Sequence, residues 1–168
     1  MNKKVYTIIL MAVLMLVIVF MKNLFLKDIQ RIAISNNNIE KFNNHILREG
    51  EYSFSLPEGW EIDSINSESS HIIATFNNKE DVYGSISILN KDVDNIYADI
   101  EGDINNSKII KDTFEWTVIT KSNGKNISNY YIRDYSEGKV LIIKFSYVEG
   151  NSKESIKIVF NYIAMSFM

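Results

Sequence analysis

The feature that most constrains this chain is an apolar run close to its N-terminus. Residues 5–21, between Lys4 and Lys22, contain no charged residue, glycine or proline. A helix over these residues is about 25 Å long, which is near the lower limit of what a bilayer requires. Residues 24–26 can extend the helix, because the long Lys22 side chain can reach the interface. The sequence therefore predicts an N-terminal transmembrane anchor with a basic flank over residues 1–26.

A cleavable signal peptide is the alternative interpretation of the same run. Such a peptide ends in small residues at its cleavage site, whereas this run ends in Val-Ile-Val-Phe-Met-Lys. A buried core helix of a soluble domain fits no better, because the run lacks the polar face that such helices have. We therefore expect an uncleaved anchor.

The charges that flank the run say little about its orientation. Lys3, Lys4 and the terminal amine lie on one side, and Lys22, Lys27 and Arg31 lie on the other. The positive-inside count is therefore close to a tie. Because short basic tails before a first hydrophobic segment usually stay inside, we expect a cytoplasmic N-terminus. The C-terminal domain would then be extracytoplasmic, held at the cell membrane by a single pass.

Charge and cysteine content exclude several classes of function. Residues 1–48 carry seven basic and two acidic groups, and residues 49–168 carry eleven basic and nineteen acidic groups. The C-terminal part is thus acidic and repels phosphate, so we expect no nucleic-acid partner. The chain has no cysteine, which excludes a disulfide scaffold, a thiol nucleophile, a thiolate zinc site and a lipid-modified cysteine.

Residues 27–44 are predicted to form a juxtamembrane linker, and residues 45–168 a single α/β domain. The spacing of apolar residues in the linker is only patchily helical. The run Ser35-Asn36-Asn37-Asn38 predicts an interruption, since Asn side chains compete for backbone hydrogen bonds outside helices. The same asparagines are also compatible with the N-cap of a short helix over residues 39–47.

Within the domain, apolar and polar residues alternate as is typical of strands. Turn signals separate the strands, and Asn123-Gly124 is the strongest short-range signal for a hairpin. Short connections favour an antiparallel meander for the last three strands. The predicted strands are 52–56, 60–65, 71–76, 83–89, 113–120, 127–135 and 140–148.

Two segments have helical periodicity instead. The first covers residues 94–107, and the second begins near Asn151, which is spaced from Glu154 as in a capping box, and runs to about Phe167. The fold class is therefore α+β, an antiparallel sheet flanked by helices. The apolar positions are Ile96, Ile100 and Ile104 in the first helix, and Ile156, Val159, Phe160, Ile163 and Phe167 in the second.

The sequence lacks motifs for catalysis and for cofactor binding. It contains no Gly-x-Ser-x-Gly elbow, P-loop or dinucleotide fingerprint. His45 and His71 both have the chemistry of a general base, but each stands alone in the sequence, without a His or Glu at a ligand spacing. We therefore predict no catalytic residue, no cofactor-binding residue and no cofactor.

One acidic segment was tested as a metal site. A calcium loop that begins at Asp99 requires glycine at its sixth position and glutamate at its twelfth, where this chain has Ile104 and Ile110. A loop that begins at Asp92 fails in the same way. We therefore predict a solvated helix face and no metal ligand. The carboxylates concerned are Asp92, Asp94, Asp99, Glu101 and Asp103.

Four aromatic residues are candidates for a contact surface, because aromatic side chains dominate binding hot spots. Alternation along the strand puts Tyr131 and Tyr135 on one face and Tyr130 on the other. Core packing explains these residues and Trp116 equally well, so we predict no site from them.

The segment YSFSLPEGW, at residues 52–60, resembles the opening of PsbP/Mog1-like domains. The order of the later elements is also similar over residues 45–168, with a Gly-Ser-Ile-x-Ile strand, an acidic helix, a three-strand meander and a last helix. The resemblance implies an α/β/α sandwich around an antiparallel sheet. Residue usage rich in Ile, Asn and Lys is typical of an AT-rich genome, so this would be a bacterial, membrane-anchored member.

The resemblance also implies a class of function. The members of known function are mostly binding or accessory proteins: photosynthetic ones support an oxygen-evolving complex, and Mog1 proteins bind a small GTPase. Neither partner suits an anchored bacterial chain, and fold does not fix function. We expect a non-enzymatic binding or accessory module that acts on another envelope protein. The alternative is an envelope small-ligand or metal receptor, or a hydrolase whose site is assembled from residues distant in the sequence.

Overall fold

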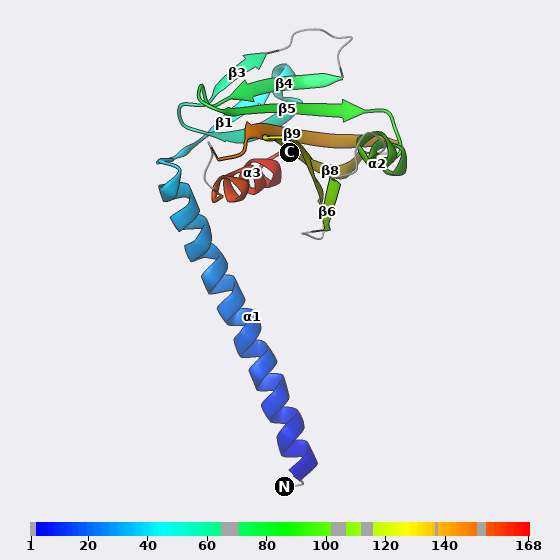
Figure 1. Cartoon of the computed structure of the whole chain (residues 1–168). Helices are drawn as coiled ribbons and strands as arrows, with labels where there is room; N and C mark the ends of the chain where they lie inside the picture. Colours follow the sequence, from blue (N-terminus) through cyan, green and yellow to red (C-terminus); the bar gives the residue numbers. More distant parts are fainter. Residues whose placement is uncertain (1–2, 65–70, 102–106, 112–115, 137, 151–153) are drawn as a thin grey trace.

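The structure is a computed structural model that describes residues 3–64, 71–101, 107–111, 116–136, 138–150 and 154–168 (Figure 1). A long N-terminal helix, α1 (Lys3–Asn36), leads into a domain made of two β-sheets and two shorter helices. The elements of the domain are β1 (Phe42–Leu47), a 3-10 turn (Arg48–Gly50), β2 (Tyr52–Pro57), β3 (Glu61–Ser64), β4 (Ile72–Asn77), β5 (Val82–Leu89), α2 (Val93–Glu101), β6 (Ser107–Lys111), β7 (Thr117–Asn123), β8 (Asn126–Ser136), β9 (Lys139–Val148) and α3 (Ile156–Met165).

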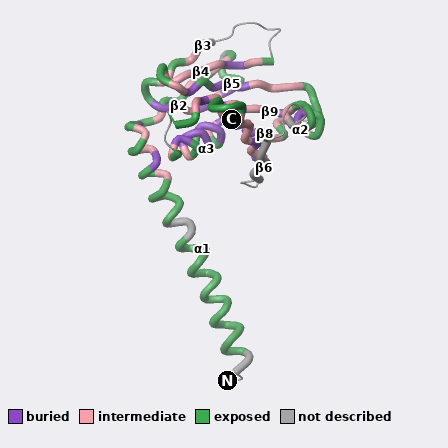
Figure 2. The backbone as a smooth tube through the Cα atoms, viewed as in Figure 1, coloured by how far each residue is buried: buried purple, intermediate pink, exposed green. Residues whose placement is uncertain are grey.

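Helix α1 contains the whole apolar run. Residues 5–21 are exposed on every side of the helix, as the green tube in Figure 2 shows. Among the described residues, α1 is the one helix long and apolar enough to cross a membrane, a test that a signal sequence would also pass. At about 1.5 Å per residue, a helix of 34 residues is about 50 Å long, well beyond the ~30 Å hydrocarbon core of a bilayer.

The asparagine run ends α1, as the sequence predicts. Asn38 has a φ of 55°, and a left-handed residue after the last turn is a common way for a helix to stop. Residues 39–47 do not form the short helix considered as an alternative. Phe42–Leu47 is instead strand β1, which pairs antiparallel with β2 from Phe42↔Pro57 to Leu47↔Tyr52. The neighbouring strand therefore outweighs the N-cap signal of the asparagines.

The main sheet has seven antiparallel strands in the order β3-β4-β5-β9-β8-β7-β6. The strands predicted near residues 52–56, 60–65, 71–76, 83–89, 127–135 and 140–148 are confirmed as β2, β3, β4, β5, β8 and β9. The predicted strand over residues 113–120 lies partly outside the described residues, and its second half begins β7.

Strand β6 is the main departure from the sequence prediction. The first predicted helix was expected to reach Ser107, but α2 is described only as far as Glu101, and Ser107 is the first residue of β6. β6 pairs with β7, with Ile109 opposite Ile119. A short apolar run such as this one cannot be assigned to helix or strand by periodicity alone. Its pairing with β7 makes it a strand.

One face of the sheet is covered by α3 and by the β1–β2 hairpin. All five residues predicted to form the apolar face of the last helix are buried: Ile156, Val159, Phe160, Ile163 and Phe167. Phe160 stacks on Phe145 of the central strand β9, with 4.2 Å between ring centroids. The helix begins at Ile156, after Ser155. Asn151 of the predicted capping box lies outside the described residues. We call this side of the sheet the closed face.

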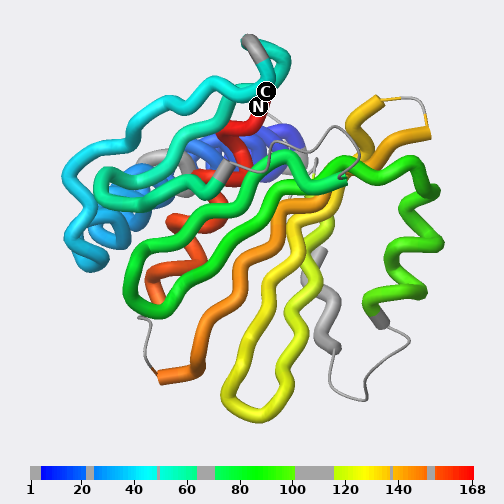
Figure 3. Tube along the Cα trace, turned by 90° about the horizontal axis from the view of Figure 1, so that it is seen from above, coloured from blue at the N-terminus to red at the C-terminus, as the bar shows by residue number. Residues whose placement is uncertain are grey.

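The opposite side, which we call the open face, is covered by a helix at one end only. There α2 packs Ile96 against Ile119, Ile132 and Val140 in a second, smaller apolar cluster. Towards β3 and β4 the same face carries polar side chains. Figure 3 shows, from above, α1 and α3 beneath the sheet and α2 beside it. Helices therefore flank both faces of an antiparallel sheet, and the predicted α/β/α arrangement is confirmed.

The C-terminal end of α1 is attached to the start of α3. Ala33 of α1 is buried, and the Asn37 side-chain amide donates to the Ala33 carbonyl at 2.7 Å. The same amide donates to the hydroxyl of Ser155, just before α3, at 2.9 Å. Buried Ile39 then leads into β1. The residues after the apolar run thus form a continuous helix that is bonded to the domain.

Candidate functional site

The two histidines do not meet in a site. His45 lies on β1, half-buried opposite Phe54, with 6.0 Å between the two rings. Burial lowers the pKa of His45 below its usual value of 6.5. His71 is exposed just before β4. Within the described residues, no three His, Asp or Glu side chains gather as metal ligands do. Neither histidine lines either of the hollows described below.

The described part of the acidic segment is exposed, as predicted. Asp92, Asp94 and Asp99 are all open to solvent. Asp99 forms a surface ion pair with Lys91 at 2.7 Å, and such exposed pairs contribute little to stability. Asp103 lies outside the described residues, as does the side chain of Glu101.

The aromatic residues divide between the two faces in the way that alternation predicts. Trp116 and Tyr131 are buried on the closed face, with their rings edge to face at 6.3 Å. Tyr135 packs at the edge of the same core, near Tyr52 and Phe167. Tyr130 is on the open face, opposite Lys144. These residues do not form one contact surface, and three of them belong to the closed-face core.

A polar pocket lies on the closed face, between α3 and the neighbouring strands β7 and β8. Its volume is about 200 Å³. Asn129 of β8 forms part of its wall and is only 2 % exposed; among the described residues it is the only polar side chain so fully buried. The pocket is lined by Val118, Thr120, Asn129, Tyr131, Lys157, Ile158 and Asn161. We call it the Asn129 pocket.

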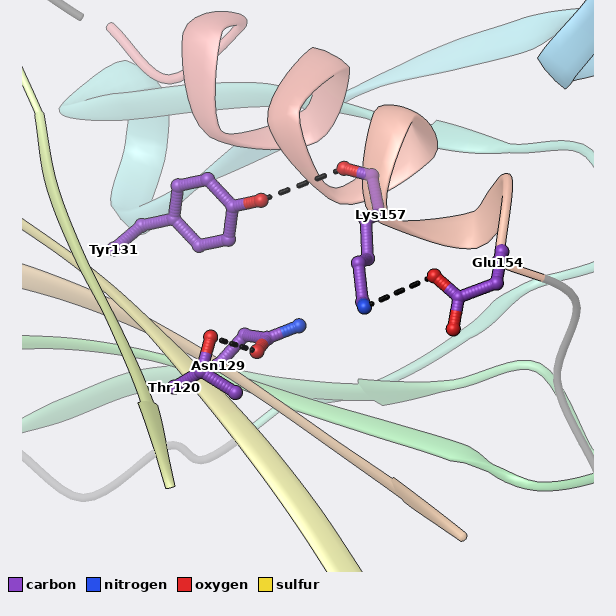
Figure 4. A network of polar contacts seen from close by, with 5 residues as sticks. All are labelled: Thr120, Asn129, Tyr131, Glu154 and Lys157. Atoms are coloured by element: carbon purple, nitrogen blue, oxygen red, sulfur yellow. Dashed lines mark hydrogen bonds and ion pairs between the residues drawn. The ribbon is translucent and has the colours of Figure 1, made fainter. Parts of the chain in front are cut away.

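The hydrogen bonds around the Asn129 pocket leave the amide nitrogen of Asn129 unused. The Thr120 hydroxyl donates to the side-chain oxygen of Asn129 at 2.9 Å, and the Tyr131 hydroxyl donates to the Lys157 carbonyl at 3.4 Å. Figure 4 shows the Asn129 amide nitrogen pointing into the space between β8 and α3. No acceptor among the described residues is bonded to it. The Asn129 side chain is buried as a whole, but this nitrogen is accessible from the pocket, so a molecule that enters the pocket can accept a hydrogen bond from it.

Lys157 adds a positive charge at the same place. Its side chain extends from α3 towards the sheet, and its ammonium group contacts Glu154 at 3.1 Å (Figure 4). The Glu154 side chain is 92 % exposed, so this pair is a weak surface interaction. The ammonium group therefore lies at the mouth of the pocket and can exchange Glu154 for another anion at little cost.

A second hollow lies on the open face, with a volume of about 300 Å³. Its floor is the part of the sheet that α2 leaves uncovered. The strand register puts Ser85 opposite Lys144 and Tyr83 opposite Ser146. The Lys144 ammonium group is 5.4 Å from the centre of the Tyr130 ring, and Tyr83 is 65 % exposed. The hollow is lined by Asp63, Thr75, Phe76, Tyr83, Gly84, Ser85, Lys144 and Ser146.

Neither hollow is marked by a motif in the sequence. The only sequence signal for the Asn129 pocket is that Asn129 occupies an inward position of an alternating strand, between Ile127 and Tyr131. The signal for the open-face hollow is a set of small hydroxyl residues in β4, β5 and β9. Both signals are weak because the hollows are made by strands and a helix that are distant in the sequence.

The comparisons with known proteins agree on the fold. No family model and no curated protein sequence matches the chain. Among solved structures, PsbP (CyanoP) from the cyanobacterium Synechocystis sp. PCC 6803 is similar, with a TM-score of 0.50 and 14 % identity over 77 % of this chain and 93 % of that one. A point mutant of the protein Mog1 has a TM-score of 0.58 and 7 % identity over 76 % of this chain and 95 % of that one.

These two likenesses cover nearly all of the other proteins, and they establish a PsbP/Mog1-like fold for this domain. They confirm the resemblance predicted from residues 52–60. At identities this low, they carry no functional residue over to this chain.

Proposed function

We propose that this chain is a membrane-anchored binding module, with its domain outside the cytoplasm, that acts on another envelope protein without catalysing a reaction. The observation that carries the proposal is the structure of α1. One helix contains an apolar run that no part of the domain covers, and continues without a break to a bonded junction with α3. An apolar surface of this size is stable in lipid and costly in water.

The open face is the binding surface that we favour. Exposed aromatic side chains are enriched at the energetic centres of protein interfaces, and Tyr83 projects from the sheet beside a hollow. Lys144 and Ser146 provide polar contacts around it. No helix of the described chain covers this part of the sheet, so the face is available to a partner.

The comparisons support a binding role only in general terms. PsbP-like and Mog1-like domains are accessory or binding proteins, which is compatible with the proposal. A small-ligand receptor is the second candidate, because the side chain of Asn129, which is buried as a residue, presents its amide nitrogen to the Asn129 pocket (Figure 4).

Topology can be tested directly because the chain has no cysteine. Single cysteines at Asn2→Cys and Lys125→Cys would be treated with a membrane-impermeant maleimide, in intact cells and after lysis. We expect Lys125→Cys to react in intact cells and Asn2→Cys to react only after lysis. The reverse pattern would mean that the domain is cytoplasmic, and recovery of a soluble chain that lacks its N-terminal segment would mean that the helix is a cleaved signal.

Binding can be tested by site-specific photocrosslinking in living cells. A photoreactive phenylalanine analogue would replace Tyr83, and the matched control would carry it at Lys125, which is exposed at the β7–β8 turn. We expect a discrete protein adduct from position 83 that disappears in a Lys144→Glu background, and none from position 125. Equal adducts from both positions, or none from either, would count against the open face as the partner site.

A further inference from the structure

We propose that the Asn129 pocket is a binding subsite for a carboxylate group, with the Asn129 amide and the Lys157 ammonium as its donors. The subsite lies on the closed face and does not depend on the binding surface proposed above. Of the polar groups that line the pocket, the Thr120 and Tyr131 hydroxyls are bonded within the protein, while the Asn129 amide nitrogen, the Lys157 ammonium and the Asn161 amide, which can either donate or accept, can meet a ligand.

The hydroxyl groups of the pocket have committed their protons. Thr120 donates to the Asn129 side-chain oxygen, and Tyr131 donates to a carbonyl of α3. The side-chain oxygen of Asn129 therefore already accepts one hydrogen bond, while its amide nitrogen points into the pocket (Figure 4). Lys157 can only donate. The free groups of Asn129 and Lys157 are thus donors, and a ligand must bring acceptors to satisfy them.

The positive charge of Lys157 and the presence of two donors favour a carboxylate as the acceptor group of the ligand. Charge-assisted bonds to an anion are about twice as strong as neutral ones, and Lys157 supplies the positive charge. A planar carboxylate has two oxygens, so one oxygen can accept from Asn129 while the other accepts from Lys157. The apolar walls, Val118 and Ile158, suit the carbon chain that carries such a group.

The size of the pocket limits what can carry the carboxylate. Its volume of about 200 Å³ is below the ~300–1,000 Å³ of pockets that take drug-sized ligands. A short free carboxylic acid fits, and so does a single acidic side chain of another protein. Both sources present the same group to the same two donors, and the experiment below separates them.

The test uses the full-length protein in detergent micelles, with the side-chain amide signal of Asn129 followed by NMR. The probes are propionate, propionamide and propylammonium, which share one size and differ in their polar group. We expect saturable shifts with propionate, at least tenfold weaker binding of propionamide, and no binding of propylammonium. Binding of propylammonium in preference to propionate would overturn the proposal, because it would mean that the Asn129 oxygen faces the pocket.

Variants assign the binding to the two donors. We expect Lys157→Met to weaken propionate binding at least fivefold, and this exposed position keeps the fold intact. Asn129→Leu, followed through the Tyr131 ring signals, should abolish binding. Lys125→Met, at the exposed β7–β8 turn, is the matched control and should leave the affinity unchanged. Propionate affinity that is unaffected by Lys157→Met would overturn the proposal, whatever the effect of Asn129→Leu on folding.

A second pair of probes identifies the source of the carboxylate. Two capped tripeptides, with Glu or Gln between glycines, would be compared with propionate. Tighter binding of the Glu peptide than of propionate would support the proposal with an acidic side chain of a protein as the natural occupant. Tighter binding of propionate would support it with a small free acid. Equal binding of the Glu and Gln peptides, without any response to propionate, would overturn it.

Discussion

The two faces of the main sheet use the same strands in opposite ways. Along β9, Leu141, Ile143 and Phe145 point to the closed face and are fully buried, while Lys144 and Ser146 alternate with them on the open face. Among the described residues, the closed face is mostly apolar and aromatic, and Asn129 is its one fully buried polar side chain. The open face is polar except under α2. The domain therefore gains its stability mainly on one side of the sheet, and the other side is free to change with function.

The largest effect expected from this comparison is the loss of an aromatic ring on the closed face. Phe145 stacks on Phe160 and meets Tyr131 edge to face at 5.6 Å. Phe145→Ala should reduce the free energy of unfolding by about 3–5 kcal/mol, measured by urea denaturation. Lys144→Ala, one residue away on the open face, should change it by no more than about 0.5 kcal/mol. Similar losses for both variants would contradict the one-sided distribution of stability.

A smaller effect is expected where β4 and β5 pack most closely. Gly84 of β5 lies opposite Phe76 of β4, and a Cβ at Gly84 would overlap the Phe76 ring. Gly84→Ala should cost about 1–3 kcal/mol through overpacking. In a Phe76→Leu background, which removes the ring, the same change should cost less, and a double-mutant cycle measures the difference. An additive result would mean that the two residues are not coupled.

The buried polar pair offers a third test. Asn129→Leu alone leaves the Thr120 hydroxyl without its acceptor, so it should lower the free energy of unfolding by about 1 kcal/mol. The double change Thr120→Val with Asn129→Leu removes both partners and should be neutral or stabilising by about 1 kcal/mol. Thermal unfolding of the two variants separates these outcomes. A double variant less stable than the single one would mean that the pair is part of the stabilising core.

The last expected effect, confined to alkaline pH, is a pH dependence that arises on the closed face. Burial, followed by the 2.6 Å hydrogen bond to Glu51, raises the pKa of Tyr52 to about 12. Tyrosine in the unfolded chain loses its proton near pH 10. Between these two values the folded chain keeps the proton and the unfolded chain does not, so stability falls as the pH rises from 10 towards 12. Urea midpoints of Tyr52→Phe should fall less in this range than those of the unchanged protein.

Strand alternation explains why most of the sheet could be predicted from the sequence. In β9, every second side chain from Leu141 to Tyr147 is buried, and only a strand with one covered face produces that pattern. The last helix could be predicted for a similar reason, since its apolar stripe is complete. These signals are local, and each is contained within one element.

What could not be predicted depends on contacts between distant segments. β1 has the sequence FNNHIL, and its two asparagines are not typical of a strand, although it pairs with β2. β6 is only five residues long, which is too short for a clear periodic pattern. The Asn129 pocket exists because α3 crosses β7 and β8 about 30 residues later in the chain, at Lys157 and Asn161. The residues next to Asn129 in the sequence do not indicate where α3 will pack.

Because α1 continues without a break into the domain, the length of the helix sets the direction in which the domain faces around the helix axis. An α-helix turns by about 100° for each residue. The hydrogen bond from Asn37 to Ser155 fixes the domain to the C-terminal end of α1. One residue inserted between Lys27 and Ala33 would rotate the open face by about 100° around the axis of α1, while seven residues, or about two turns, would return it to within about 20° of its original direction. The length of α1 and the direction of the open face are therefore coupled, whereas a flexible linker would leave that direction free.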